Sequence, residues 1–271
     1  MPHASSHGIR IAYDDLGRGE PALLFLPGWC VPRTVFADLL PLCSRNRRVL
    51  ALDWRGHGES APSSSDFGDV ALAEDALAVI KASGARSIVP VAQAHAGWVA
   101  VELRHALKDR IPLLVFLDWI ITEAPASFVA VLDGMRSTER WRETKDSLFA
   151  QWLENTDNRK VSDFVRKEVN SCPADMWSRA AREIAAAYSR FASPLKLLSS
   201  LKPPVPTLHL YSQPDDPSYF AAQESFAADH PWFRVRKLPA RTHFPMLEVP
   251  SLIADAIESS VAETMTAQAR P

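Results

Sequence analysis

The chain has 271 residues, a length that fits one α/β domain with one insertion. Of these residues 47% are hydrophobic and 23% charged, which is ordinary for a globular protein. The net charge of −2 argues against a nucleic-acid partner, and no apolar run approaches the ~20 residues that a membrane span needs. The cysteines Cys30, Cys43 and Cys172 lie far apart, and the N-terminus lacks an apolar signal core, so we expect a cytoplasmic protein without a disulfide framework.

Short apolar runs that alternate with turn signals indicate a sheet in the first part of the chain. Strands are predicted at residues 22–27, 48–53, 88–92 and 113–118, and helices at 71–83 and 97–107, the first of them ending at Gly84. Continuous apolar strands separated by helices are typical of a parallel sheet that is covered on both faces.

Residues 119–193 have a different pattern, because they read as helices throughout and hold four of the eight tryptophans. Strand signals return at 205–211 and 233–238, and a last helix is expected at 251–262. We therefore predict an α/β core at 1–118 and 194–271, with a helical cap at 119–193 inserted after the strand that ends at Asp118. The cap should lie over the carboxyl ends of the strands, where such sheets bind ligands.

Three turn segments, at residues 26–30, 92–97 and 241–245, follow predicted strands in the layout of the α/β-hydrolase fold. In that fold the nucleophile occupies a strand-to-helix elbow with small residues two positions before and after it. This spacing places Ala94 at the nucleophile position, between Ala92 and Ala96. Assigning His95 instead would put Gln93 where a small residue is required.

An alanine at the elbow has no hydroxyl, thiol or carboxylate, so nucleophilic catalysis from Ala94 is excluded. One interpretation is a former hydrolase that now only binds a ligand. His243 favours an enzyme, because a histidine on the loop after the last strand is where this fold keeps its base. The acid that orients this base is either Asp118 or one of Asp215 and Asp216. We prefer Asp118, because it follows a buried strand, whereas the other two lie in a turn flanked by prolines.

The backbone N–H groups of Trp29 and His95 are expected to form an oxyanion hole, since they lie on the turn after the first strand and directly after the elbow position. These donors belong to the main chain and do not depend on a serine. A base and an anion-binding hole without a nucleophile can remove a proton from an acidic substrate and stabilise the anion, but cannot form an acyl-enzyme.

Several motifs of the sequence closely resemble the cofactor-independent 3-hydroxy-4-oxoquinoline and 3-hydroxy-4-oxoquinaldine 2,4-dioxygenases. They include LPGWC, DWRGHG, FLDW, the cap segments ERWRE and LFAQW, SQP, HPWF and RTHFP, and they extend from about residue 19 to 257. DWRGHG alone is shared with many hydrolases, whereas the combination of LDW, the cap tryptophans, SQP and RTHFP is specific.

This resemblance implies a ring-cleaving dioxygenase that uses neither metal nor flavin, with O₂ as co-substrate. The family's dyad falls on His243 and Asp118, which would deprotonate the 3-hydroxyl of a 3-hydroxy-4(1H)-quinolone. The anion would react directly with O₂ to give an N-acylanthranilate and carbon monoxide. Trp152 and Trp177 match cap tryptophans of the family and are expected to contact the substrate, although each could equally be a core residue of the cap.

The sequence departs from the family at Ala94, where a serine is usual, at Gln93, and at Val31, where a polar residue is usual. These changes make the expected substrate-binding region more apolar and favour a 2-alkyl substrate, while Ala94 could be natural or engineered. Two alternatives stay open: another proton-transfer enzyme such as a lyase, and a non-catalytic ligand-binding homologue. The expected partners are a small aromatic heterocycle and O₂, in a monomer or homodimer.

Overall fold

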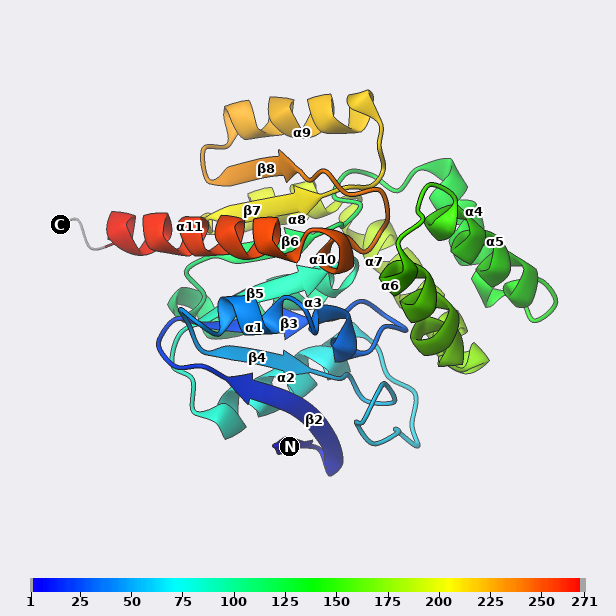
Figure 1. The fold of residues 1–271 in the computed structure, drawn as a ribbon, viewed down its shortest axis with the longest axis horizontal. Helices are drawn as coiled ribbons and strands as arrows, with labels where there is room; N and C mark the ends of the chain where they lie inside the picture. Colours follow the sequence, from blue (N-terminus) through cyan, green and yellow to red (C-terminus); the bar gives the residue numbers. More distant parts are fainter. Residues whose placement is uncertain (1, 269–271) are drawn as a thin grey trace.

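The computed structural model describes residues 2–268, and within them an eight-stranded sheet forms the centre of the molecule (Figure 1). The strands are adjacent in the order β1-β2-β4-β3-β5-β6-β7-β8. All pairs from β4 to β8 are parallel, whereas β1 and β2 join the edge antiparallel. The strands span His3–Ser6 (β1), Ile9–Leu16 (β2), Ala22–Leu26 (β3), Val49–Leu52 (β4), Ile88–Gln93 (β5), Leu114–Leu117 (β6), Thr207–Tyr211 (β7) and Phe233–Lys237 (β8).

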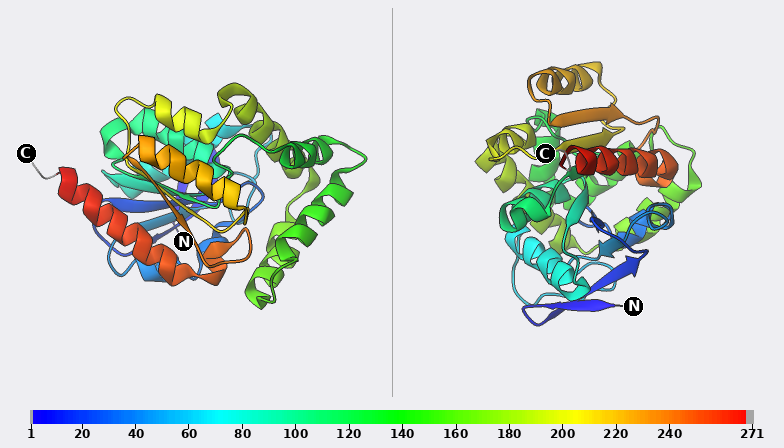
Figure 2. Two further views of the ribbon diagram at one scale, coloured as in Figure 1. Left: turned by 90° about the horizontal axis from the view of Figure 1, so that it is seen from above. Right: turned by 90° about the vertical axis from the view of Figure 1, so that its left-hand side faces the viewer.

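Helices cover both faces of this sheet (Figure 2). One face carries α1 (Leu40–Cys43) and α11 (Pro250–Gln268), and the other carries α2 (Asp69–Ser83), α3 (Ala96–Leu107) and α8 (Pro194–Ser200). The remaining core elements are η1 (Arg33–Phe36), η2 (Lys108–Arg110), α9 (Pro217–Asp229) beside β8, and α10 (Pro245–Glu248). Among the helices of residues 2–268, none is both long and apolar enough to cross a membrane.

The inner strands are buried along their whole length, which confirms the prediction of a parallel sheet between two helical layers. Every residue of β3, β4, β5, β6 and β7 is buried, as expected when neither face of the sheet meets water. Helix α2 ends as predicted at Gly84, whose φ of 69° is the left-handed conformation that glycine adopts at low cost.

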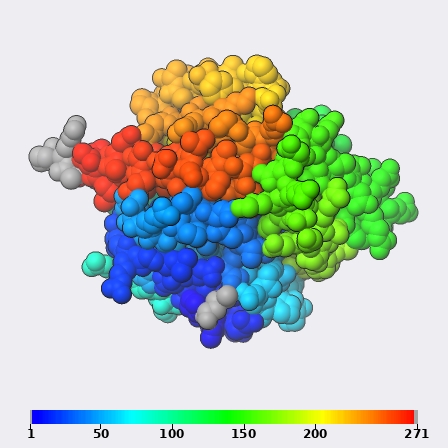
Figure 3. All heavy atoms as spheres, viewed as in Figure 1, coloured from blue at the N-terminus to red at the C-terminus, as the bar shows by residue number. Residues whose placement is uncertain are grey.

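A group of helices is inserted between β6 and α8 and lies beyond the carboxyl ends of the parallel strands, where it forms a separate lobe of the surface (Figures 1 and 3). This confirms the predicted helical cap, while its division from the core at residues 118 and 193 stays a prediction. The inserted elements are α4 (Ala126–Arg136), α5 (Trp141–Leu153), α6 (Arg159–Asp163), the π-helical turn η3 (Phe164–Glu168), η4 (Val169–Ser171) and α7 (Ala174–Phe191).

Helix α7 ties the cap to the core through ion pairs with the loop that precedes α2. Arg179 Nε lies 2.9 Å from Asp66 Oδ1, and an Arg182 guanidinium nitrogen lies 3.0 Å from Asp66 Oδ2. Their hydrogen bonds lower the pKa of Asp66 to about 2, so this carboxylate is ionised at neutral pH. The guanidinium of Arg179 also lies 4.3 Å from the ring centre of Phe67, which adds a cation–π interaction between α7 and the same loop.

Some elements were missed by the sequence pattern. In β2 the buried residues are confined to a central run of Ile11, Ala12 and Tyr13, which is too short to stand out in the sequence. Helix α9 begins at a turn signal, because Asp216 caps it by accepting a hydrogen bond from Ser218 N–H over 2.8 Å. The last helix is longer than the predicted 251–262 and runs over Pro250–Gln268, since its final turns are largely polar and carry no apolar periodicity.

Candidate active site

Ala94 lies in the turn between β5 and α3, where the sequence places the elbow. This residue has a φ of 48°, a left-handed value that is unfavourable for a residue with a Cβ and persists only where the surrounding structure imposes it. Its N–H donates to Leu117 O over 2.8 Å, and its carbonyl accepts from Gly97 N–H over 3.0 Å. A Cβ on Gly97 would lie 2.3 Å from the ring of Trp119, so glycine is needed for α3 to pack this closely.

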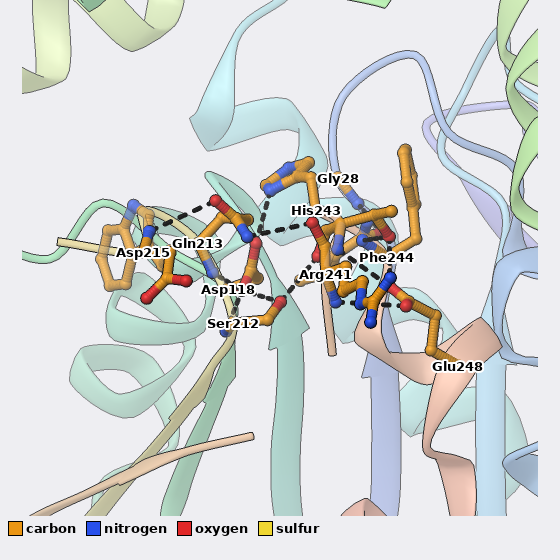
Figure 4. Close-up of polar contacts among 12 residues, drawn as sticks. Gly28, Asp118, Ser212, Gln213, Asp215, Arg241, His243, Phe244 and Glu248 are labelled. Atoms are coloured by element: carbon orange, nitrogen blue, oxygen red, sulfur yellow. Dashed lines mark hydrogen bonds and ion pairs between the residues drawn. The ribbon is translucent and has the colours of Figure 1, made fainter. Parts of the chain in front are cut away.

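His243 and Asp118 meet at the same end of the sheet (Figure 4). Nδ1 of His243 lies 2.8 Å from Oδ2 of Asp118, whose side chain is fully buried, while the imidazole is 23% exposed. With the Nδ1 proton donated to this carboxylate, the neutral ring keeps the lone pair on Nε2. The pair therefore has the geometry of an oriented general base.

Backbone and side-chain donors hold the carboxylate of Asp118 from the other side. Its Oδ1 accepts from Ser212 N–H over 2.6 Å, Ser212 Oγ–H over 2.8 Å and Gln213 N–H over 3.0 Å. By contrast, Asp215 and Asp216 are exposed, and they pair with Lys237 and cap α9. Of the three candidate acids, the structure thus brings Asp118 to His243.

Hydrogen bonds to the two residues before His243 hold the loop that carries it. Glu248 of α10 accepts from the N–H groups of Arg241 over 3.1 Å and of Thr242 over 2.9 Å. The oxygen of the Ser212 hydroxyl also lies 2.6 Å from Thr242 O, so its one proton is shared between this carbonyl and Asp118 and links the two loops. Ser212 and Glu248 were missed as site residues, although Ser212 belongs to the SQP motif.

The two predicted oxyanion-hole residues lie on neighbouring turns. Oε1 of Gln93 accepts from Gly28 N–H over 3.2 Å, and a Cβ on Gly28 would lie 3.6 Å from the Cβ of Ala94. Gln93 is completely buried and joins the turn of Trp29 to the elbow. Within residues 2–268, the backbone N–H groups of Trp29 and His95 donate no hydrogen bond, so both are available to an anionic oxygen.

The imidazole of His95 is held neutral beside the dyad. Nδ1 of His95 accepts from Trp119 Nε1–H over 3.3 Å, which leaves the ring proton on Nε2. Burial, together with the nearby His243, lowers the pKa of His95 to about 3. The imidazole of His95 is therefore not the base of this site, and His243 is the ring that is paired with a carboxylate.

Aromatic side chains of the cap face the dyad. The indole of Trp152 in α5 stacks on the imidazole of His243, with ring centres 5.3 Å apart and planes 19° apart. Phe149 stacks in turn on Trp152 at 5.6 Å, and Trp177 of α7 contacts Phe149 edge-on at 5.8 Å. Trp152 thus touches the predicted base directly, whereas the buried Trp177 is connected to it only through Phe149 and Trp152.

A buried carboxyl at the cap–core seam predicts a dependence of stability on pH. Burial of Asp69, and then the charge of Glu183 in α7, raise the pKa of Asp69 to about 7. An unfolded chain releases this proton near pH ~3.9, so between pH ~4 and ~7 the folded state binds more protons than the unfolded state. The contribution of Asp69 to the free energy of unfolding therefore falls as the pH rises through this window.

We expect Asp69→Asn to remove this decline. Melting temperatures of the wild type and the variant are measured from pH 4 to pH 8. The melting temperature of the variant should rise relative to that of the wild type as the pH increases. Curves that run parallel across this range would show that Asp69 does not titrate in this way.

Comparisons with known proteins agree with this geometry. The model of the alpha/beta hydrolase family matches residues 23–256. The chain is 39% identical to a 2-heptyl-3-hydroxy-4(1H)-quinolone dioxygenase of Mycobacteroides abscessus, over 92% of this chain and 93% of that protein. It is 37% identical to a 1H-3-hydroxy-4-oxoquinoline 2,4-dioxygenase of Pseudomonas putida, over 95% of this chain and 98% of that protein. A similar solved structure is that of AqdC in complex with its product, a protein that recognises and cleaves the ring of the Pseudomonas quinolone signal. It superposes on this chain with a TM-score of 0.92 and 37% sequence identity, over 97% of this chain and all of that one.

Proposed function

The chain belongs to the 3-hydroxy-4-quinolone dioxygenases of the alpha/beta hydrolase family, and we propose that it cleaves the ring of a 3-hydroxy-4(1H)-quinolone with O₂. One structural observation supports this most strongly. An oriented His243–Asp118 pair lies in a hydrolase fold whose elbow residue, Ala94, cannot act as a nucleophile. Such a site is suited to forming a substrate anion rather than an acyl-enzyme.

In the proposed mechanism, Nε2 of His243 takes the proton of the substrate 3-hydroxyl, and Asp118 stabilises the imidazolium that results. The backbone N–H groups of Trp29 and His95 bind the oxygen on which negative charge develops. The electron-rich ring then reacts with O₂ at C2 and C4, and C3 leaves with its own oxygen as carbon monoxide. Substrate and O₂ together thus give one N-acylanthranilate and one carbon monoxide.

This reaction is tested with ¹⁸O₂ and a 3-hydroxy-4-quinolone. Both labelled atoms should appear in the N-acylanthranilate, and the carbon monoxide should be unlabelled. A lyase would give products without ¹⁸O, and a ligand-binding homologue would leave the substrate intact, so either result would contradict the proposal.

For the substrate we propose a quinolone with a 2-alkyl chain, from methyl to heptyl. Ala94 and Val31 are both buried and apolar beside the elbow and the turn of Trp29, and a relative at 39% identity is named for the 2-heptyl compound. Comparing kcat/KM for 2-H, 2-methyl and 2-heptyl substrates tests this choice. A preference for the 2-H compound would contradict it.

Restoring a hydroxyl at the elbow is expected to have a small effect. In Ala94→Ser the new side chain can donate one hydrogen bond to a substrate oxygen, worth about 0.5–1.5 kcal/mol net, or at most roughly tenfold in affinity. Substrate titration and kcat should show a larger change in KM than in kcat. Serine-directed phosphonates should leave the wild type unlabelled, and a larger loss of kcat in Ala94→Ser than in His243→Ala would show that the catalytic centre is misassigned.

We also propose that the reaction needs no metal or flavin. Metal-activated O₂ chemistry typically uses two histidines and a carboxylate that converge on one ion. Within residues 2–268, the one close group of metal-type ligands is Cys30, His57 and Cys172, and it contains neither residue of the dyad. Metal analysis should find no stoichiometric iron or copper, and chelators should not inhibit. Iron that tracks activity across preparations would overturn this.

Two further properties remain proposals: a cytoplasmic location, in keeping with the three free cysteines, and a monomeric or homodimeric state. Size-exclusion chromatography with light scattering tests the second directly.

A further inference from the structure

Two cysteines, one from the core and one from the cap, meet beside the proposed oxyanion hole. Cys30 directly follows Trp29 in the turn after β3; it is buried and has a φ of 63°. Cys172 lies between η4 and α7 and is partly exposed. Their sulfur atoms and a ring nitrogen of His57 all lie within 4.8 Å of one another. Both thiols are free, so the seam between cap and core holds an unused pair of reactive groups.

The hydrogen bonds of His57 argue against a metal ion as the purpose of this group. Nδ1 of His57 lies 3.0 Å from Arg55 O, to which it donates, and Nε2 accepts from Cys30 N–H over 3.0 Å. Burial lowers the pKa of His57, so the ring is neutral and both nitrogens serve to brace the turn. With the imidazole lone pair occupied, the two sulfurs are left to react with each other.

We propose that Cys30 and Cys172 form a reversible disulfide when the enzyme meets peroxide, and that this bond ties the cap to the turn of Trp29 and slows turnover. The predicted effect on turnover rests on the proposed function, because the proposed mechanism assigns anion binding to the N–H of Trp29. The formation of the disulfide concerns the two thiols alone.

The chemistry proceeds in two steps. Cys172 is the more exposed of the two residues. Its thiolate attacks the O–O bond of hydrogen peroxide, which gives a sulfenic acid and releases hydroxide. The sulfur of Cys30 then attacks the sulfenic sulfur, its proton passes to solvent, and a second hydroxide leaves. Two thiols and one peroxide thus give one disulfide and two waters. Burial, together with its hydrogen bond to Cys172, raises the pKa of the Cys30 thiol, so Cys30 is not the sulfur that peroxide oxidises first.

The bond must change the shape of the site. A disulfide joins its sulfurs at about 2.05 Å, so both side chains turn towards each other and draw the cap and the turn together. Because Trp29 is the next residue to Cys30, its N–H moves with the turn. A displacement of about 1 Å in a group that positions the reacting atoms can cost on the order of 10²-fold in rate.

Peptide mapping with a parallel assay tests the proposal. Reduced protein is treated with hydrogen peroxide in the presence of EDTA, alkylated in denaturant and digested. We expect a cross-linked peptide that joins Cys30 to Cys172 and is lighter by two hydrogen atoms than the two thiol peptides together. Turnover should fall by about tenfold or more, the effect of a misplaced oxyanion donor, and dithiothreitol should restore it.

Two single variants separate this bond from general oxidation. Cys172→Ser should keep its turnover after peroxide, whereas Cys43→Ser should lose it as the wild type does, because Cys43 is buried elsewhere, in α1. Absence of the cross-linked peptide, or equal inactivation of Cys172→Ser and the wild type, would overturn the disulfide. A cross-linked enzyme with full turnover would overturn its effect. If the reduced protein cleaves no quinolone, the proposed function fails while the peptide map still reports on the bond.

Discussion

His243→Ala is expected to lower kcat by about 10²–10⁴-fold at neutral pH, the range that a positioned general base contributes. Within residues 2–268, His243 is the imidazole that pairs with the buried Asp118, and the neighbouring His95 is kept neutral by burial. The variant therefore has no side chain to replace the lost base. Steady-state kinetics with a 3-hydroxy-4-quinolone measure this loss.

Raising the pH should restore part of the activity of His243→Ala, since solvent hydroxide can then remove the proton of the 3-hydroxyl. The wild type should respond much less over the same range. Near-wild-type kcat in His243→Ala at neutral pH would refute the role of this residue.

Asp118→Asn is expected to lower kcat by roughly 10²–10⁴-fold, because an amide cannot serve all the partners of this carboxylate. One carboxylate oxygen accepts three hydrogen bonds from Ser212 and Gln213, and the other faces Nδ1 of His243. If the amide oxygen stays with the three donors, the NH₂ group faces Nδ1 and favours the wrong tautomer of the imidazole. If the amide is flipped, its NH₂ group meets N–H donors.

Asp215→Asn is the matched control for this prediction. Asp215 is exposed and pairs with Lys237, so its loss should leave kcat unchanged. Circular dichroism shows whether Asp118→Asn is folded before its kinetics are compared. A larger loss of kcat in Asp215→Asn than in Asp118→Asn would reassign the acid of the dyad.

The parallel core could be predicted because its signals are local. Buried strands such as β3 and β6 are continuous apolar runs, and Gly84 ends α2 through its own backbone preference. The small residues around Ala94 indicated the turn between β5 and α3, whereas the positive φ of Ala94 became visible only in the structure. Helix α9 escaped prediction because Pro217, which is well tolerated in a first turn, also reads as a turn residue.

The support of the site could not be predicted, because it joins residues that are distant in sequence. Ser212 reaches Asp118 across 94 positions, and no short pattern specifies that contact. Even Glu248, six residues after Thr242, binds this loop only because the short helix α10, which ends at Glu248, turns the chain back on it. The stacking of Trp152 on His243 depends likewise on how the cap settles on the core.

The most direct test of the account is the absorption spectrum of the substrate bound to the enzyme without O₂. Proton removal by His243 precedes the reaction with O₂, so the wild type should convert a bound 3-hydroxy-4-quinolone to its anion under anaerobic conditions at neutral pH. After O₂ is admitted, the bound anion should be converted to N-acylanthranilate and carbon monoxide. Substrate bound to His243→Ala without O₂ should show the spectrum of the neutral form. A neutral substrate on the wild type, or equal anion formation in His243→Ala, would contradict the account.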